Sequence, residues 1–529
     1  MKLRIKIIVS LCLITTITYA QRNVVLLIAD DIGTDYFGFS EDKADTVGVP
    51  NIRSLLTKGI RFKNAMANPV CSPTRSGMLT GRYSFRTGVG YVVGSPGAGE
   101  LDTAEITIPR LLKNFNPAIG RAHIGKWHLQ GPNPSSHLLY PNVMGWQHFE
   151  GPFSGAITSF TNWTKITNGI TSTVTTYATS ENVNNAVSWL RTQGNNRVFM
   201  WLAFNAPHTP LHLPPSSLHT YTNLPGTVTD INNNPKSYFK AMMQALDTEI
   251  GRLIDSLKAM NRFDSTDFIF MGDNGNTQQT AQITNLSHAK GSIYQYGVHE
   301  PFIISGPSVV NPGRVSDALI NTVDVFATVL ELFGHANWSS QIPLNKPVDS
   351  KSLLPIIKSQ TVDVRPWTFT ETFRTPYVSG DGKAMRNKDY KLIRFDNVVQ
   401  ELYNLNLDPN EAVNLLAGAL NPTDISNYYY LCNEMATLVG NSNVCNNEVG
   451  MAELIHDAKM VRVYPNPFKD FIRIEDLNKN DEYQLLNVSG QILYKGKNIG
   501  EKDFSYLPKG VYILQNTRTG ILPIRLVKE

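Results

Sequence analysis

The sequence predicts an α/β protein with a doubly wound, mostly parallel sheet, a smaller C-terminal α+β subdomain and a terminal all-β module. Three observations predict this fold class. Continuous apolar runs end abruptly in polar residues, and stretches with the apolar period of a helix lie between those runs. The segment after Met460 instead contains only short alternating strands separated by turn residues.

The apolar runs have the character of strands that are buried on both faces of a parallel sheet. They are Val24–Ala29, Val198–Phe204 and Phe268–Met271. Between the last two, the segment 238–260 has apolar residues at spacings of three and four, as an amphipathic helix does. Parallel sheets of this kind bind ligands at the carboxyl ends of their strands. We therefore expect four or five strand ends to meet in one crevice.

Oxygen-bearing side chains follow two of these strands. Asp30 and Asp31 come after the first run, and Asp273 and Asn274 come after "FIFMG". Each pair by itself is also typical of a turn. Two acid-ended buried strands in one sheet favour a cation site instead. Three carboxylates and an amide, with no His or Cys at comparable positions, suit Ca²⁺ or Mg²⁺ better than zinc.

Cationic and proton-carrying residues occur in three further segments. "HIGKWHLQG" contains Lys126 and His128 at i and i+2, on one face if the segment is extended. "NAPHTPLH" contains His208, and "SHAKGS" contains Lys290. Lysines and an arginine around a divalent cation form a receptor for an oxyanion, and histidines supply a general acid and base. Each histidine alone is equally compatible with a structural role.

The four cysteines divide into distinct groups. Cys12 lies in the leading segment, and Cys432 and Cys445 are close enough in sequence to form a disulfide in an oxidising compartment. Cys71 is then the odd thiol. A lone cysteine is usually a small buried hydrophobic residue, but the polar stretch 72–75, "SPTR", is typical of a loop or a helix start.

The first twenty residues have the pattern of a secretory signal peptide. Lys2, Arg4 and Lys6 precede the apolar stretch 7–17, and "TYA" ends the segment at a site suited to cleavage. We therefore expect an exported protein without a membrane span, since no later segment is apolar over the necessary ~20 residues. Removing the three positive residues lowers the formal net charge from +4 to +1, which gives no indication of a nucleic-acid partner.

The motifs together resemble those of the formylglycine-dependent sulfatases of the alkaline-phosphatase superfamily, over roughly residues 22–420. The most specific is C-x-P-x-R followed by Leu-Thr-Gly-Arg. The resemblance implies that Cys71 is oxidised to formylglycine by a formylglycine-generating or anaerobic sulfatase-maturing enzyme that reads Pro73 and Arg75. The matching stretches are "VVLLIADDIG", "CSPTRSGMLTGR", "HIGKWHLQG", "NAPHTPL", "GDNG", "HAKGSIYQYG" and "ELYNLNLDPNEAVNL".

The resemblance also implies a role for each residue singled out above. The hydrated aldehyde at position 71 would be both the nucleophile and a metal ligand, and one Ca²⁺ would be the cofactor. A diol is needed because its second hydroxyl can expel sulfate by carbon–oxygen cleavage, which divides one difficult step into two. The implied calcium ligands are Asp30, Asp31, Cys71, Asp273 and Asn274. The implied catalytic residues are Cys71, which becomes the diol; Arg75 and Lys126, which steady it; Lys126 and Lys290, which bind sulfate; His208 with Lys290, which protonates the leaving alcohol; and His128, which accepts the proton of the second hydroxyl.

The chain departs from the family pattern just after Lys290. Many relatives read "EGG(V)R-x-P" where this chain has "QYGVHEP", residues 295–301. This loop borders the pocket mouth in the family, so close relatives do not predict the substrate. His212 and His299 are our candidate substrate-binding residues.

The resemblance divides the chain into five parts. These are a signal peptide (1–20), the catalytic α/β domain (21–350), an antiparallel-sheet subdomain (351–440), an Asn- and Gly-rich linker (441–457) and a β-sandwich-like module (458–529). The last part, with "VYPNPF" and "LPKGVYIL", resembles the sorting domain of type IX secretion in Bacteroidetes. It implies that the type IX machinery exports the protein through the periplasm to the cell surface or medium.

The predicted function is hydrolysis of sulfate esters of a sulfated carbohydrate. The secretion signals favour an algal polysaccharide such as ulvan, carrageenan or fucoidan, or its oligosaccharides; a glycosaminoglycan is the second choice. A formylglycine-dependent phosphonate or phosphodiester hydrolase is an alternative, whereas a two-zinc phosphatase would need metal ligands that are not found. A catalytically silent carbohydrate-binding relative would have lost some of the six catalytic residues, and all are present.

Overall fold

The structure is a computed structural model that describes residues 22–441, 444–445, 463–474, 481–487, 491–516 and 524–529. The predicted signal peptide and most of the predicted linker lie outside these ranges. The chain forms two compact units. The first consists of Met1–Asn414 and Tyr430–Ser442, and the second of Leu415–Tyr429 and Asn443–Glu529.

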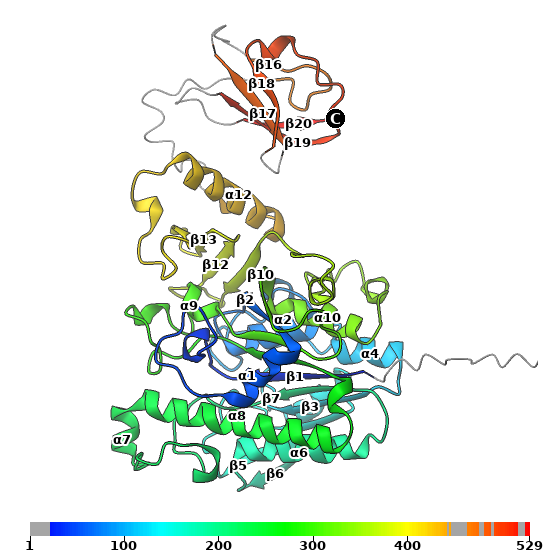
Figure 1. Ribbon diagram of the computed structural model, residues 1–529, viewed down its shortest axis with the longest axis vertical. Coiled ribbons are helices and arrows are strands. Elements are labelled where there is room, and N and C mark those ends of the chain that lie inside the picture. The colour runs from blue at the N-terminus through cyan, green and yellow to red at the C-terminus, as the bar shows by residue number, and fades with distance from the viewer. Residues whose placement is uncertain (1–21, 442–443, 446–462, 475–480, 488–490, 517–523) are drawn as a thin grey trace, which may run out of the picture. The chain divides into compact units, whose positions relative to one another are not determined.

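A ten-stranded sheet forms the centre of the first unit (Figure 1). Its strand order is β10-β2-β9-β8-β1-β7-β3-β4-β5-β6. The central strands β8, β1, β7 and β3 are parallel, and β9, β5 and β6 run antiparallel to their neighbours. The strands are β1 (Asn23–Ala29), β2 (Gly59–Met66), β3 (Gly120–Gly125), β4 (His148–Gly151), β5 (Trp163–Thr167), β6 (Ile170–Val174), β7 (Val198–Ala203), β8 (Thr266–Gly272), β9 (Phe302–Ser305) and β10 (Arg314–Asn321).

The apolar runs are buried on both faces because helices cover both faces of this sheet. Along β1, Val24, Leu26 and Ile28 belong to one hydrophobic core, and the alternate residues belong to the other. Figure 1 shows α6 and α8 on one side of the sheet and α2 and α10 on the other. This arrangement confirms the predicted doubly wound α/β class. The helices of the first unit are α1 (Pro50–Ser54), α2 (Cys71–Thr80), α3 (Ser84–Thr87), α4 (Ile108–Phe115), α5 (Tyr140–Val143), α6 (Ala178–Thr192), α7 (Val228–Asn233), α8 (Pro235–Ala259), α9 (Gln295–Val298), α10 (Val325–Leu332) and α11 (Leu354–Ile357).

A second, four-stranded antiparallel sheet belongs to the same unit. Its order is β11-β12-β13-β14. The strands are β11 (Thr368–Thr372), β12 (Gly382–Arg386), β13 (Tyr390–Phe395) and β14 (Gln400–Asn404). The two segments predicted to be adjacent strands, "AMRNKDYKLIRF" and "QELYNLNLDP", contain β12, β13 and β14. Helix α12 (Pro422–Val439) follows, and its residues are divided between the two units.

The second unit has an all-β terminal part, as predicted. Its four-stranded antiparallel sheet has the order β18-β17-β19-β20, and β15 pairs with β16. Phe468, Leu485 and Leu514 are among the buried residues of its own hydrophobic core. The strands are β15 (Val463–Tyr464), β16 (Arg473–Ile474), β17 (Tyr483–Asn487), β18 (Ile492–Gly496), β19 (Gly510–Asn516) and β20 (Ile524–Lys528).

The described cysteines differ in whether they form a disulfide. Cys432 and Cys445 are disulfide-bonded, and Cys71 is free and buried. Among the described residues, no helix is long and apolar enough to span a membrane.

Candidate active site

The candidate metal ligands lie together because β1 and β8 are parallel neighbours. Ala29 pairs with Gly272 at the ends of the two strands, so Asp30 and Asp273, which follow them, lie next to each other. The backbone N–H of Asp31 donates to Oδ1 of Asp273 at 3.1 Å. Both carboxylates and that of Asp30 are buried. The structure therefore brings the two acid-ended strands to one point, as the sequence predicts.

Each of the three carboxylates has a basic partner. Nζ of Lys126 donates to both oxygens of Asp30, at 2.9 and 2.6 Å. Arg75 donates through Nε and Nη2 to Oδ2 of Asp273, at 2.9 and 2.7 Å, and Lys290 pairs with Oδ1 of Asp31. Lys126 lies in the segment after β3, Arg75 on α2 and Lys290 in the loop before α9. They offset the negative charge that burial would otherwise make very unfavourable.

Two buried oxygen atoms at this point nevertheless have no hydrogen-bond partner within the part of the chain that the structure describes. They are Oδ2 of Asp31 and Oδ1 of Asn274. Nδ2 of Asn274 donates to the other oxygen of Asp31, at 2.8 Å, which leaves both unpaired oxygens available to a ligand. Unsatisfied buried oxygens are rare and costly in folded proteins. An all-oxygen set of this kind fits a hard cation such as Ca²⁺.

The thiol of Cys71 faces the same carboxylates. Ligand atoms of Asp30, Cys71 and Asp273 all lie within 4.8 Å of one another. Cys71 is the first residue of α2, a helix that is buried along its whole length. The prediction of a helix start is therefore correct. The side chain is also buried, as a small hydrophobic residue would be, but its surroundings are charged.

His128 adjoins Cys71 from the segment that follows β3. Its Nδ1 lies 3.1 Å from the Cys71 sulfur, and its Nε2 lies 3.4 Å from the carbonyl oxygen of Val93. The residue has a positive φ of 55°, so the segment is not the simple extended strand that would place Lys126 and His128 on one face. Lys126 instead contacts Asp30, and His128 contacts the thiol. Both still line the same site.

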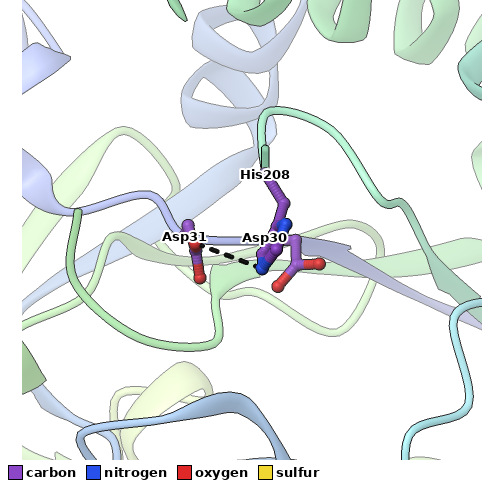
Figure 2. Close-up of side chains that lie close together, drawn as sticks. All are labelled: Asp30, Asp31 and His208. Carbon is purple, nitrogen blue, oxygen red and sulfur yellow. Dashed lines mark ion pairs between the residues drawn. The ribbon is translucent and has the colours of Figure 1, made fainter. Parts of the chain in front are cut away.

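His208 approaches from the segment that follows β7 (Figure 2). Its Nε2 lies 3.5 Å from the unpaired Oδ2 of Asp31. Ligand atoms of Asp30, Asp31 and His208 also lie within 4.8 Å of one another. His208 and Lys290 thus both contact Asp31, from two different loops. All six predicted catalytic residues and all predicted metal ligands lie in this one cluster.

The charges of the site shift several pKa values. Burial raises the pKa of Asp31, but His208 and Lys290 outweigh burial and hold it below its ordinary value. Burial and the charge of Asp30 raise the pKa of Asp273, and Arg75 opposes them. Burial, aided by the positive charges of Lys126 and Arg75, lowers the pKa of His128 well below its ordinary value. A neutral imidazole of this kind can accept a proton.

The two candidate substrate-binding histidines make contacts of a different kind. His212 lies against the rings of Phe160 and Tyr177, and burial lowers its pKa to about 4. Nε2 of His299 lies 2.7 Å from the carbonyl oxygen of Lys63, and its Nδ1 lies 3.4 Å from Asp42. These contacts supply no link to the catalytic cluster, and the substrate role of both histidines stays a prediction.

Two asparagines of the site were not predicted from the sequence. Asn276 accepts a hydrogen bond from the backbone of Gly33 through its side chain, and its carbonyl accepts one from the backbone of Lys290, both at 2.9 Å. Asn205 follows β7, is 2% exposed, and its amide has no partner among the described residues. Asn276 lies in "GDNGN" and Asn205 in "NAPHTP", and each stretch follows a buried strand. This position after a strand is the sequence pattern from which both residues could have been predicted to lie at the site.

The fold and the site together define a class of enzyme. A doubly wound α/β sheet places a buried thiol, three carboxylates, cationic side chains and two histidines at the carboxyl ends of its strands. This arrangement is typical of hydrolases that act on esters of tetrahedral oxyanions.

The comparison with protein families agrees with this class. The sulfatase family model matches residues 22–335, more than half of the chain, and the protein belongs to the sulfatase family, whose members hydrolyse sulfate esters. The model for the C-terminal region of N-sulphoglucosamine sulphohydrolase matches residues 287–428. The secretion system C-terminal sorting domain matches residues 462–522, and the last part of the chain is therefore a type IX sorting domain.

Named relatives and solved structures are similar to this chain at low identity. Human N-acetylgalactosamine-6-sulfatase is 26% identical over 376 residues, which cover 65% of this chain and 67% of that protein. Mouse arylsulfatase J is 26% identical over 336 residues and 59% of this chain, and the match spans about half, 52%, of its length. The crystal structure of Ps i-CgsB in complex with k-i-k-neocarrahexaose has a TM-score of 0.67 at 24% identity, covering 79% of this chain and 92% of that one. This last likeness shows the fold.

Proposed function

We propose that the protein hydrolyses sulfate esters of a sulfated carbohydrate, with a formylglycine at position 71 and one calcium ion. The observation that carries the proposal is the position of Cys71. Its sulfur lies 3.1 Å from the imidazole of His128 and within 4.8 Å of carboxylate oxygens of Asp30 and Asp273. A thiol used only for packing has no need of an imidazole and two buried carboxylates. In the proposed active form, oxygens of the hydrated aldehyde stand where the sulfur lies.

Calcium fits the donor atoms of this site. Asp30, Asp31, Asp273 and Asn274 would hold it, and the unpaired oxygens of Asp31 and Asn274 support this assignment. When bound, the ion would neutralise charge on the nucleophile and on a sulfate oxygen. The ion would add to the positive charges of Lys126, Lys290 and Arg75 that face the three carboxylates.

The side chains of the chain itself suggest how the proton transfers occur. His128, whose pKa is held low by burial and by nearby positive charges, accepts the proton of the second hydroxyl of the hydrated aldehyde, so that sulfate is expelled and the aldehyde is restored. His208 contacts one carboxylate oxygen of Asp31 and Lys290 contacts the other. Together these two residues donate a proton to the oxygen of the departing alcohol. Lys126 and Lys290 bind sulfate oxygens. The net reaction consumes one water and yields the alcohol and sulfate.

A polysaccharide or its oligosaccharides are the proposed substrate. The sorting domain supports export to the cell surface or the medium, where a polymer that cannot enter the cell is encountered. Ulvan, an algal polymer, is the specific candidate. The names of two similar proteins point to related chemistry, one to N-acetylgalactosamine sulfate and one to a neocarrahexaose. Glycosaminoglycan and carrageenan oligosaccharides therefore belong in the first substrate panel.

Three partners complete the proposal. A formylglycine-generating or anaerobic sulfatase-maturing enzyme would convert Cys71, reading Pro73 and Arg75. The type IX machinery would carry the protein from the periplasm across the outer membrane, and the sulfated carbohydrate is the substrate.

The experiment combines a chemical and a kinetic measurement on the same protein. Mass spectrometry of the peptide that contains residue 71 should show formylglycine or its hydrate. Sulfate release should be detected from 4-nitrophenyl sulfate and from one class among ulvan, carrageenan and chondroitin sulfate oligosaccharides, and Cys71→Ala should abolish it. Fully active protein with an unmodified thiol would overturn the mechanism. Turnover of phosphonates or phosphodiesters, without sulfate release, would instead identify the alternative enzyme class.

A further inference from the structure

Two exposed loops meet next to the active site, and neither contains a proposed catalytic residue. The first follows α3 and includes Tyr91, and the second follows β11 and includes Arg374 and Tyr377. The backbone of Phe373 donates to Gly90 at 3.1 Å, and further along the backbone of residue 375 donates to residue 97 at 3.0 Å. The loops therefore form one continuous rim.

Val93 connects this rim to the nucleophile. Its backbone N–H donates to the hydroxyl of Ser72, the residue after Cys71, at 3.1 Å. Its carbonyl oxygen lies 3.4 Å from Nε2 of His128. Tyr91 is only two residues away from Val93. The rim is therefore connected through Val93 both to the residue that follows Cys71 and to His128, and it adjoins the catalytic cluster on that side.

The arginine of this rim is held in a fixed position. Its guanidinium carbon lies 4.0 Å from the centre of the Tyr91 ring. Nη2 of Arg374 donates to Asp381 at 2.8 Å and Nε at 3.2 Å. Asp381 also accepts the backbone N–H groups of residues 374 and 378, at 3.1 and 2.9 Å. The carboxylate of Asp381 thus accepts hydrogen bonds from several positions of this loop, and the Asp381 side chain is fully buried.

One edge of the guanidinium remains available. Nη1 of Arg374 donates no hydrogen bond within the part of the chain that the structure describes, and the side chain is 17% exposed. An arginine fixed by a carboxylate and an aromatic ring loses little conformational freedom when it binds a ligand. Its planar donors match the oxygens of a carboxylate or a sulfate.

Two exposed side chains follow Arg374 in the same loop. Tyr377 is 59% exposed and Val378 is 45% exposed, three and four residues after Arg374. The ring of a tyrosine offers an apolar face together with a polar hydroxyl, which suits contact with a sugar ring.

We propose that Arg374, stacked on Tyr91, and Tyr377 form a subsite for the sugar unit next to the one whose sulfate is removed, and that this neighbour carries its own carboxylate or sulfate. The inference rests on the proposed carbohydrate sulfatase function. It specifies the substrate further: an oligosaccharide charged on adjacent units, with Arg374 binding the anion and Tyr377 the ring.

The test compares four variants on three substrates. The substrates are 4-nitrophenyl sulfate, the oligosaccharide of the panel that the wild type hydrolyses fastest, and its counterpart without the neighbouring charged group. The variants are Arg374→Ala, Arg374→Lys, Tyr377→Ser and the control Arg197→Ala. Arg197 also lies over an aromatic ring, 4.9 Å from that of Phe333, but it precedes β7 at the opposite edge of the sheet.

We expect Arg374→Ala to raise KM for the charged oligosaccharide about tenfold, with kcat changed much less, because a charge-assisted hydrogen bond is lost. The ratio of kcat/KM for this oligosaccharide to kcat/KM for 4-nitrophenyl sulfate should fall by the same factor. On the uncharged counterpart the effect of Arg374→Ala should largely disappear, and Arg374→Lys should restore part of the loss. Tyr377→Ser should lower the ratio for both oligosaccharides, and Arg197→Ala should leave it within about twofold of the wild type.

Several outcomes would overturn the subsite. One is an unchanged ratio in both Arg374→Ala and Tyr377→Ser; another is an equal loss on all three substrates, which would reveal a structural role. Because removing Arg374 leaves Asp381 buried without its ion-pair partner, Arg374→Ala could fail to fold, and Tyr377→Ser at its exposed position then decides the question. A wild type that hydrolyses 4-nitrophenyl sulfate but no carbohydrate would overturn the carbohydrate function itself and the subsite with it.

Discussion

The imidazole of His128 and the thiol of Cys71 lie 3.1 Å apart, although 57 residues separate them in the chain. The contact exists because α2 begins at Cys71 and the segment after β3 turns through a positive φ at His128. Both residues lie at the carboxyl edge of the same sheet. The proposed nucleophile position and the proposed base are thus adjacent in the structure.

The first prediction concerns this base. His128→Gln should lower kcat for 4-nitrophenyl sulfate by roughly 10²- to 10⁴-fold, the range expected when a general base is lost. His148→Gln is the matched control, since His148 pairs with Glu150 on β4 and takes no part in the proposed mechanism. Steady-state kinetics of both variants, with formylglycine content measured in each, provides the check. A His128→Gln enzyme with wild-type kcat would exclude the proposed role.

The second prediction concerns the cation. Removal of metal by a chelator should lower the thermal midpoint of unfolding, because the cation binds only the folded site and stabilises it. Ca²⁺ should restore the midpoint better than Zn²⁺, given oxygen ligands. Asp31→Asn should weaken this response to Ca²⁺. The midpoint can be measured by calorimetry without any substrate, and an identical value for metal-free protein with and without Ca²⁺ would contradict the assignment.

The third prediction concerns Glu371 on β11. Burial raises its pKa to about 7, with one hydrogen bond from the backbone of Phe85 and the charge of Lys383 opposing the shift. The folded state therefore keeps this proton to higher pH than the unfolded state. The stability that this group contributes is complete below about pH 4.5 and is lost as the pH rises through about 7, an effect on the order of 3 kcal/mol.

Glu371→Gln should remove this loss, because the amide stays neutral and can still accept the hydrogen bond from Phe85. The thermal midpoint of the variant relative to the wild type should therefore rise between pH 4.5 and 7 and stay constant above. Glu100→Gln, at an exposed position, serves as the control. If the difference in thermal midpoint between Glu371→Gln and the wild type does not vary with pH, the pKa of Glu371 is not raised in the folded state.

The fourth prediction concerns the C-terminal module. Every proposed catalytic residue belongs to the first compact unit, so a chain that ends at residue 457 should keep nearly the full activity of the purified protein on 4-nitrophenyl sulfate. In a host with type IX secretion, the same truncation should leave the enzyme in the periplasm. Loss of affinity for polymer, with activity on the small substrate retained, would identify the module as a carbohydrate-binding domain.

The sequence predicted which candidate metal ligands meet because these residues directly follow buried strands. Buried strands appear as apolar runs, and the residues that follow them must lie at one edge of a parallel sheet. Asp30 and Asp273 could therefore be assigned to one point without coordinates. The observed strands differ from the predicted runs by one or two residues at an end: β8 starts at Thr266 instead of Phe268, and β7 ends at Ala203 instead of Phe204.

The tertiary structure decided what depends on contacts between distant segments. Asn205 and Asn276 follow buried strands, but only packing leaves the amide of Asn205 without a hydrogen-bond partner among the described residues and places Asn276 between Gly33 and Lys290. The pairing of Arg374 with Tyr91 joins loops that are nearly three hundred positions apart. The sequence by itself determined the chemical groups and the class of sheet that gathers them, because apolar strand runs and the polar residues that end them are local patterns. Which loops border the pocket, and which polar atoms remain free in it, follows from long-range packing that no local pattern records.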